Sequence, residues 1–190
     1  MPRARSPLRI TGGRWIGRTV SCPPGPIRPA TSEMRESMFA ILGDLCGIHF
    51  LDLFAGSGIM TLEALSRGAE TALLVEKDRR KRRTILENLR IAEKERGNLD
   101  GIKLKIMPVE HALRSGIQRY DVIYTDPPFS MSNKKSILIL ADRARQPTPR
   151  GTLILHYPSR NKMPDTTDNL RLYDVRGYGQ SRLAFYTRDN

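Results

Sequence analysis

The sequence Asp126-Pro127-Pro128-Phe129 follows Thr125 and an apolar segment at Tyr120–Tyr124, and it combines a carboxylate, two prolines and an aromatic ring. Proline fixes the backbone and has no N–H group, so the segment offers mainly hydrogen-bond acceptors: the Asp126 carboxylate and nearby carbonyl oxygens. The exocyclic amino group of a nucleobase carries two N–H donors in the plane of a ring. We therefore expect this segment to hold such an amino group while Phe129 stacks on the base. The alternative interpretation is a proline-rich exit from a strand.

A second segment, residues 52–58, reads Asp-Leu-Phe-Ala-Gly-Ser-Gly and lies between a short apolar strand and a helix. Such a turn presents backbone amides to a ligand at the start of a helix. Glu76 ends the next apolar strand twenty residues after Gly56, a distance that suits contact with ribose hydroxyls. Thr61 replaces the third glycine of a dinucleotide fingerprint, which disfavours a dehydrogenase, and the missing Gly-Lys-Ser/Thr excludes a Walker loop. An ordinary strand–helix turn is the alternative.

The elements that must position both segments alternate along the chain. Apolar runs predict strands at residues 50–53, 72–76, 102–107, 120–124, 151–157, 170–175 and 183–187. Helical patterns are expected at residues 33–41, 59–66, 78–96, 110–113 and 137–144. This alternation predicts an α/β fold with a parallel sheet covered on both faces and a closing hairpin. In such sheets ligands bind at the carboxyl ends of the strands, where both segments fall.

Charge points to the class of partner. The 190 residues contain 32 Lys and Arg against 20 Asp and Glu, a formal net charge of +12. This balance favours a polyanion such as nucleic acid, and a basic enzyme without such a partner is the alternative. A run of basic residues at 79–83 could grip RNA phosphates, although a solvated helix face explains it equally well.

The N-terminal region predicts a second basic surface. Gly12-Gly13 lies between two β-prone runs within residues 8–20 and predicts a hairpin. We expect the hairpin to hold phosphate and stack on bases through Arg9, Arg14, Trp15 and Arg18. The alternative is a solvated hairpin that packs Trp15 against the body of the protein.

Several classes are disfavoured. Cys22 and Cys46 are the only cysteines and lack C-x-x-C spacing, so neither a disulfide framework nor a zinc site is supported, and a reducing cytoplasm fits. No apolar run approaches membrane-spanning length. The N-terminus is basic but lacks the apolar segment of a secretory signal. We therefore expect a cytoplasmic protein without metal or membrane association.

Taken in order, residues 52–58, Glu76 and residues 126–129 resemble S-adenosylmethionine-dependent methyltransferases that act on amino groups of nucleic acid bases. The resemblance is narrowed to the bacterial 16S rRNA guanine-N2 methyltransferases of the RsmD type by three further segments, residues 9–18, 28–36 and 178–186. The resemblance extends from Leu8 to Arg188. It implies a Rossmann-like, seven-stranded methyltransferase sheet, mostly parallel with the last strand antiparallel, preceded by an N-terminal β-hairpin. We expect a basic arm and hairpin at residues 1–27, a methyltransferase domain at residues 28–190, and a monomer.

The resemblance also implies site residues. The cofactor would be S-adenosyl-L-methionine, with its methionine end lined by Asp52, Phe54, Ala55, Gly56, Ser57 and Gly58. Glu76 would hold the ribose and Lys77 would lie beside the adenine, while Asp126 to Phe129 would receive guanine. Arg28 and Thr31 would lie near the entrance for cofactor and substrate, where we expect Thr31 to contact the cofactor and Arg28 to contact the RNA. Relatives often carry a polar side chain where Pro108 stands, so the Val109 backbone is expected to contact the adenine.

The implied reaction is direct transfer of a methyl group to the guanine N2 amine of 16S rRNA, on the small ribosomal subunit, with no covalent intermediate or metal. Two alternatives remain open. An adenine-N6 methyltransferase acting on DNA or RNA could use the same acceptor segment, residues 126–129. A non-catalytic RNA-binding assembly factor could keep the fold. Binding of RNA alone, however, does not require the glycine turn at residues 52–58, Glu76 and Asp126 together.

Overall fold

The computed structural model describes residues 8–23 and 30–189. Within these residues the main sheet has seven strands in the order β5-β4-β3-β6-β7-β9-β8, and β9 runs in the direction opposite to the other six. The strands are β3 (His49–Leu53), β4 (Thr71–Glu76), β5 (Ile102–Ile106), β6 (Val122–Thr125), β7 (Thr152–Pro158), β8 (Leu170–Tyr178) and β9 (Ser181–Arg188). The predicted sheet with its antiparallel last strand is confirmed.

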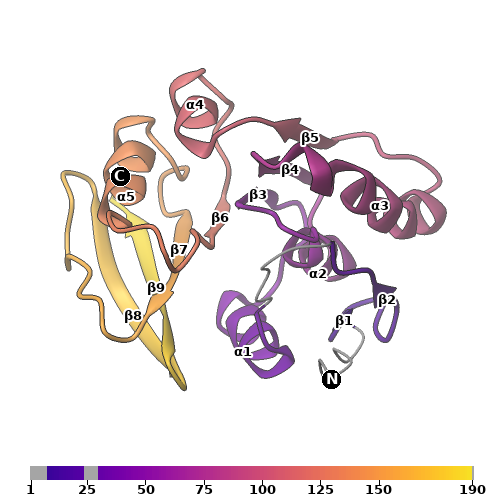
Figure 1. The fold of residues 1–190 in the computed structure, drawn as a ribbon, viewed down its shortest axis with the longest axis horizontal. Helices are drawn as coiled ribbons and strands as arrows, with labels where there is room; N and C mark the ends of the chain where they lie inside the picture. The colour runs from indigo at the N-terminus through magenta and orange to yellow at the C-terminus, as the bar shows by residue number, and fades with distance from the viewer. Residues whose placement is uncertain (1–7, 24–29, 190) are drawn as a thin grey trace.

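Helices pack on both faces of this sheet (Figure 1). One apolar core includes side chains of α1 (Ser32–Leu42), α2 (Ile59–Ser66) and α3 (Arg82–Arg96), and the other includes side chains of α4 (Val109–Arg114) and α5 (Lys135–Arg143). Successive residues of β3 alternate between them, because Phe50 joins the first core and Leu51 and Leu53 join the second. Asp52 therefore faces the side of the sheet that α2 covers.

A small antiparallel hairpin precedes the sheet. Its strands β1 (Leu8–Arg9) and β2 (Thr19–Val20) are two residues long each. The loop between them lies on the end of α2, where the Arg14 and Trp15 N–H groups donate to the Ser66 carbonyl and hydroxyl oxygens, both at 2.8 Å. Only glycine fits at Gly13, because a Cβ there would lie 2.1 Å from the Ser66 carbonyl oxygen. The predicted hairpin is confirmed.

Two helix starts show how side chains set the boundaries. Thr31 caps α1, since its hydroxyl oxygen accepts a 3.2 Å hydrogen bond from the Met34 N–H. The single helix expected over residues 78–96 instead begins as a 3₁₀ turn at Arg79–Lys81, and α3 follows at Arg82. The Asp78 carboxylate accepts from the Arg80 N–H at 3.0 Å, which favours this tight turn.

Candidate active site

A cavity of about 550 Å³ opens at the carboxyl ends of β3, β4 and β6. This is the edge at which a doubly wound sheet binds ligands. The predicted site residues that line it are Asp52, Phe54, Ala55, Gly56, Ser57, Glu76, Lys77, Asp126, Pro127, Pro128 and Phe129. The two sequence segments, about seventy residues apart, therefore contribute to one cavity.

Three other predicted cofactor residues do not line the cavity. Gly58 starts α2 with a left-handed φ of +78°, and a Cβ there would come within 3.2 Å of Leu74, so its role is to form the turn. The hydroxyl of Thr31 caps α1. Val109 is buried at the start of α4, away from the cavity lining. The expected adenine contact at Val109 remains a prediction.

Two residues of the glycine turn have left-handed backbone angles. Phe54 has a φ of +67° and Gly56 a φ of +60°. A left-handed angle at a phenylalanine costs on the order of 1 kcal/mol, and such strain tends to occur at ligand sites. The Ala55 N–H donates to the Val75 carbonyl oxygen at 3.0 Å, which ties the turn to β4.

Glu76 joins the turn to the next strand. One carboxylate oxygen, Oε1, accepts from the Asp78 N–H, and the other, Oε2, accepts from the Gly56 N–H and the Lys81 ammonium, each at 3.0 Å. The side chain is buried, so these bonds fix its position. Each carboxylate oxygen has two lone pairs, so Oε1 keeps one for a ligand hydroxyl.

Asp52 is the most perturbed acid of the cavity. Its carboxylate is buried and accepts hydrogen bonds from the Thr61 hydroxyl at 2.9 Å and the Thr61 N–H at 3.3 Å. Burial is the main cause that raises the pKa of Asp52 to about 7; the Thr61 hydrogen bonds oppose it, and the nearby Asp126 and Glu76 carboxylates contribute a smaller increase to the same value. A cationic ligand would favour its charged form.

The acceptor segment at residues 126–129 is fixed by two residues that the sequence did not single out. The Asp126 carboxylate lies 2.8 Å from Nδ1 of His156, a buried residue of β7, and the Phe129 ring packs edge-on against the same imidazole at 5.4 Å between ring centroids. The buried Lys134 ammonium donates to the Phe129 carbonyl oxygen at 3.0 Å and to the Met131 carbonyl oxygen at 2.6 Å. The sequence signal for the contact of His156 with Asp126 was the presence of a histidine within the apolar run at residues 151–157.

The predicted RNA-binding residues fall into three groups. Arg9, Arg14 and Arg18 are exposed on the hairpin, and Arg18 forms an ion pair with Glu95 of α3. Arg28 lies outside the described residues. The expectation that Trp15 stacks on RNA bases is wrong. Only 3% of its surface is exposed, because the hairpin folds onto α2 and the ring packs in the first core. Its ring packs against the protein and is not available to stack on RNA.

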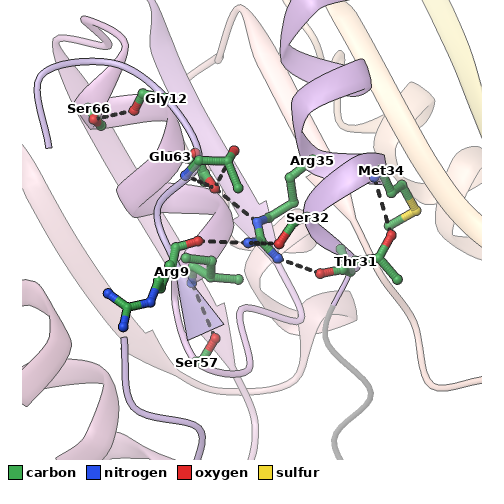
Figure 2. Close-up of polar contacts among 12 residues, drawn as sticks. Arg9, Gly12, Thr31, Ser32, Met34, Arg35, Ser57, Glu63 and Ser66 are labelled. Carbon is green, nitrogen blue, oxygen red and sulfur yellow. Dashed lines mark hydrogen bonds and ion pairs between the residues drawn. The ribbon is translucent and has the colours of Figure 1, made fainter. Parts of the chain in front are cut away.

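A buried ion pair holds the hairpin, α1 and α2 together (Figure 2). The Arg35 guanidinium donates to the Glu63 carboxylate at 2.9 Å, to the Ala30 carbonyl oxygen at 2.5 Å and to the Arg9 carbonyl oxygen at 2.7 Å. The same Glu63 oxygen accepts from the backbone and the hydroxyl of Thr11, both at 2.9 Å. Because Ala30 lines the cavity, this network fixes one wall of the site relative to the basic hairpin.

In the part of the chain that the structure describes, no group of three or more His, Cys, Asp or Glu residues is arranged to hold a metal ion. None of the helices there is both long enough and apolar enough to cross a membrane.

The strand order, the antiparallel β9 and the cavity between glycine turn and acceptor segment define the class of Rossmann-like methyltransferases. Within that class, the family model described as conserved hypothetical protein 95 matches residues 8–187. The chain belongs to this family, which includes ribosomal RNA small subunit methyltransferase D.

Three relatives indicate the extent of the similarity. Ribosomal RNA small subunit methyltransferase D of Escherichia coli (strain K12) is 30% identical over 184 residues, covering 96% of this chain and 90% of its own. The solved structure of the yhhF protein of Escherichia coli superposes with a TM-score of 0.84 at 27% identity, covering 97% of this chain and 99% of the other. The solved structure of a hypothetical protein of Thermus thermophilus has a TM-score of 0.76 at 30% identity, covering 94% of this chain and 98% of the other.

Proposed function

We propose that the protein transfers a methyl group from S-adenosyl-L-methionine to the exocyclic N2 amine of a guanine in small-subunit rRNA. The observation that carries this proposal is the single cavity lined by the glycine turn, by Glu76 and by the Asp126-Pro-Pro-Phe segment. The first two suit the cofactor and the third suits the amine. The family relationship and the rRNA methyltransferase relative support the class of substrate.

The residues of the cavity fit this cofactor. When bound, S-adenosyl-L-methionine supplies a methyl group attached to a positively charged sulfur, and it also carries an ammonium group. Asp52 lines the cavity as a buried carboxylate whose hydrogen bonds come from Thr61, so a cationic ligand would supply the counter-charge it lacks. The free lone pair on Glu76 Oε1 is available to a ribose hydroxyl.

The acceptor segment would orient the amine. Its nitrogen lone pair is delocalised into the purine ring, which makes it a poor nucleophile. Hydrogen bonds from its two N–H groups to the Asp126 carboxylate and the Pro127 carbonyl oxygen would favour a pyramidal nitrogen whose lone pair faces the methyl group. Holding the reacting atoms in this alignment would supply much of the acceleration. The new nitrogen–methyl bond would replace the sulfur–methyl bond, the sulfur would leave as a neutral thioether, and the nitrogen would pass one proton to water to restore the neutral amine.

The exposed arginines of the basic hairpin support the proposal that RNA is the partner. The exposed apolar residue at its tip supports the proposal that the substrate is an assembled ribosomal subunit. Arg14 and Arg18 are exposed around Ile16, which has 67% of its surface exposed. An apolar side chain between arginines suits a surface that presents both protein and RNA.

The test is transfer of labelled methyl from S-adenosyl-L-methionine to small ribosomal subunits that lack their native modification, and to free 16S rRNA. The RNA is digested and its nucleosides are separated. We expect label in N2-methylguanosine, with subunits as the better substrate. Label in N6-methyladenosine would replace this proposal with an adenine-N6 methyltransferase. No label on either substrate, with the cofactor bound, would contradict the proposed RNA substrate.

A further inference from the structure

His156 lies beside the reacting end of the cavity because of the sheet register. Tyr124 of β6 pairs with Ile154 of β7, and a step of two residues along each parallel strand keeps the same face. That step leads to His156 within β7 and to Asp126, the residue that directly follows the end of β6. The register therefore brings the two side chains together, and their Oδ1 and Nδ1 atoms are 2.8 Å apart.

We propose that His156 is a positioning residue for methyl transfer, whose Nδ1–H holds Asp126 Oδ1 so that Oδ2 faces the substrate amine. This inference rests on the proposed function. The imidazole touches both working parts of the acceptor segment, since it bonds the Asp126 carboxylate and packs edge-on against the Phe129 ring. His156 is the described residue that hydrogen-bonds the Asp126 side chain within 3.5 Å, through Oδ1, while the buried Tyr124 hydroxyl lies near the same carboxylate. The bond to Oδ1 leaves Oδ2 for a ligand.

The surroundings of the His156 imidazole indicate that it positions Asp126 and does not accept the proton released from the amine. Only 5% of the His156 surface is exposed, and its Nε2 is buried with no hydrogen-bond partner among the described residues. A proton on Nε2 would be a buried N–H without an acceptor, which is costly. The favoured form is therefore the neutral ring with its proton on Nδ1, directed at Asp126. A ring in this form donates a fixed hydrogen bond and is a poor place to receive the proton released from the amine.

Two substitutions separate the hydrogen bond from the packing. His156→Phe keeps an aromatic edge against Phe129 but removes the N–H donor. His156→Asn loses the ring but keeps an amide donor near the position of Nδ1. His49→Phe is the matched control, because His49 is a half-buried histidine that bonds Thr71 at 2.7 Å at the opposite end of β3.

We expect His156→Phe to lower kcat on the order of 100-fold, because a small displacement of a group that aligns the reactants has this effect. The KM for RNA and the Kd for S-adenosyl-L-methionine stay at the wild-type values, since neither contact is removed. His156→Asn recovers most of the lost kcat, and His49→Phe retains wild-type kcat. Equal kcat in wild type and His156→Phe would overturn the inference. So would His156→Phe outperforming His156→Asn, which would assign the effect to packing.

A second readout does not depend on activity. Nitrogen-15 NMR of the three labelled histidines reports which ring nitrogen carries the proton, and the spectrum of His156→Asn identifies the signal of His156. We expect the Nδ1-protonated form in wild type and a changed signal in Asp126→Ala. A signal typical of the Nε2-protonated form would overturn the inference. If wild type methylates no RNA while this signature is present, the proposed function fails and the Asp126–His156 hydrogen bond stands.

Discussion

The Gly56 N–H donates a 3.0 Å hydrogen bond to the Glu76 carboxylate across the ends of two neighbouring parallel strands. Leu53, three residues before Gly56, is the register partner of Val75, which directly precedes Glu76, so the sheet itself brings the glycine turn and the acidic residue together. The ribose end of the proposed cofactor site is therefore formed before any ligand arrives. A preformed site avoids the cost of ordering its own groups on binding.

Replacing Glu76 with Ala is expected to weaken binding of S-adenosyl-L-methionine by about 10- to 100-fold, the effect of losing about 1–3 kcal/mol of hydrogen bonding. The substitution removes the ribose acceptor and leaves the half-buried Gly56 and Asp78 N–H groups without their partner. Calorimetric titration measures the affinity, and the melting temperature shows whether the variant is folded. Unchanged affinity in a folded variant would exclude Glu76 from the cofactor site.

Asp52 is expected to make cofactor affinity depend on pH. Because its pKa is about 7, the carboxyl is largely protonated at pH 6 and largely charged at pH 8. A cationic ligand binds the charged form better, so affinity for S-adenosyl-L-methionine should rise between these values. Titrations of wild type and Asp52→Asn across this range test the effect, and a variant with the same slope as wild type would show that another group is responsible.

The same shift predicts the sign of a stability change. The pKa of Asp52 is raised from 3.8 to about 7 in the folded protein, so the folded state binds more protons than the unfolded state between these values. The contribution of this group to stability therefore decreases as pH rises from about 4 to about 7. The difference between wild type and Asp52→Asn in urea unfolding isolates it, and a difference that grows in favour of wild type with pH would contradict the assignment.

Removing the Arg35 side chain is expected to lower the free energy of unfolding by about 1.5–3 kcal/mol, because the buried Glu63 carboxylate then keeps only Arg67 as a charged partner. The Ala30 and Arg9 carbonyl oxygens also lose their donor. Both side chains are completely buried. Arg35→Met tests this by urea unfolding. The matched control is Arg83→Met, at an exposed pair with Glu87, which should leave stability unchanged. A small effect of Arg35→Met would show that the network does not hold the hairpin to the body.

The basic hairpin is expected to bind RNA phosphates. Arg14→Ala should weaken RNA binding and reduce the slope of log affinity against log salt by about one, the effect of losing one phosphate contact. Trp15→Phe should lower stability and leave this slope unchanged, since Trp15 is buried. Filter binding over a range of salt concentrations measures both. An unchanged slope in Arg14→Ala would remove Arg14 from the interface.

The strands, the helices and the cavity could be predicted because their signals are local. Apolar runs gave the strands, and both chemical segments fell at strand ends, where a parallel sheet gathers ligand contacts. The burial of Trp15 depends instead on contact with Ser66, fifty-one residues away, and a tryptophan between arginines and glycines looks exposed in the sequence. The pairing of Asp126 with His156 depends in the same way on the register of β6 and β7.

The most direct measurement compares wild type with Asp126→Ala in a single turnover on modification-free small ribosomal subunits, together with the Kd for S-adenosyl-L-methionine. If Asp126 orients the amine while the glycine turn and Glu76 hold the cofactor, labelled methyl transfer falls by about 100-fold or more, as expected for lost alignment, and the Kd is unchanged. Transfer at the wild-type rate, or loss of cofactor binding as the main effect, would contradict the division of the cavity into a cofactor half and an amine half.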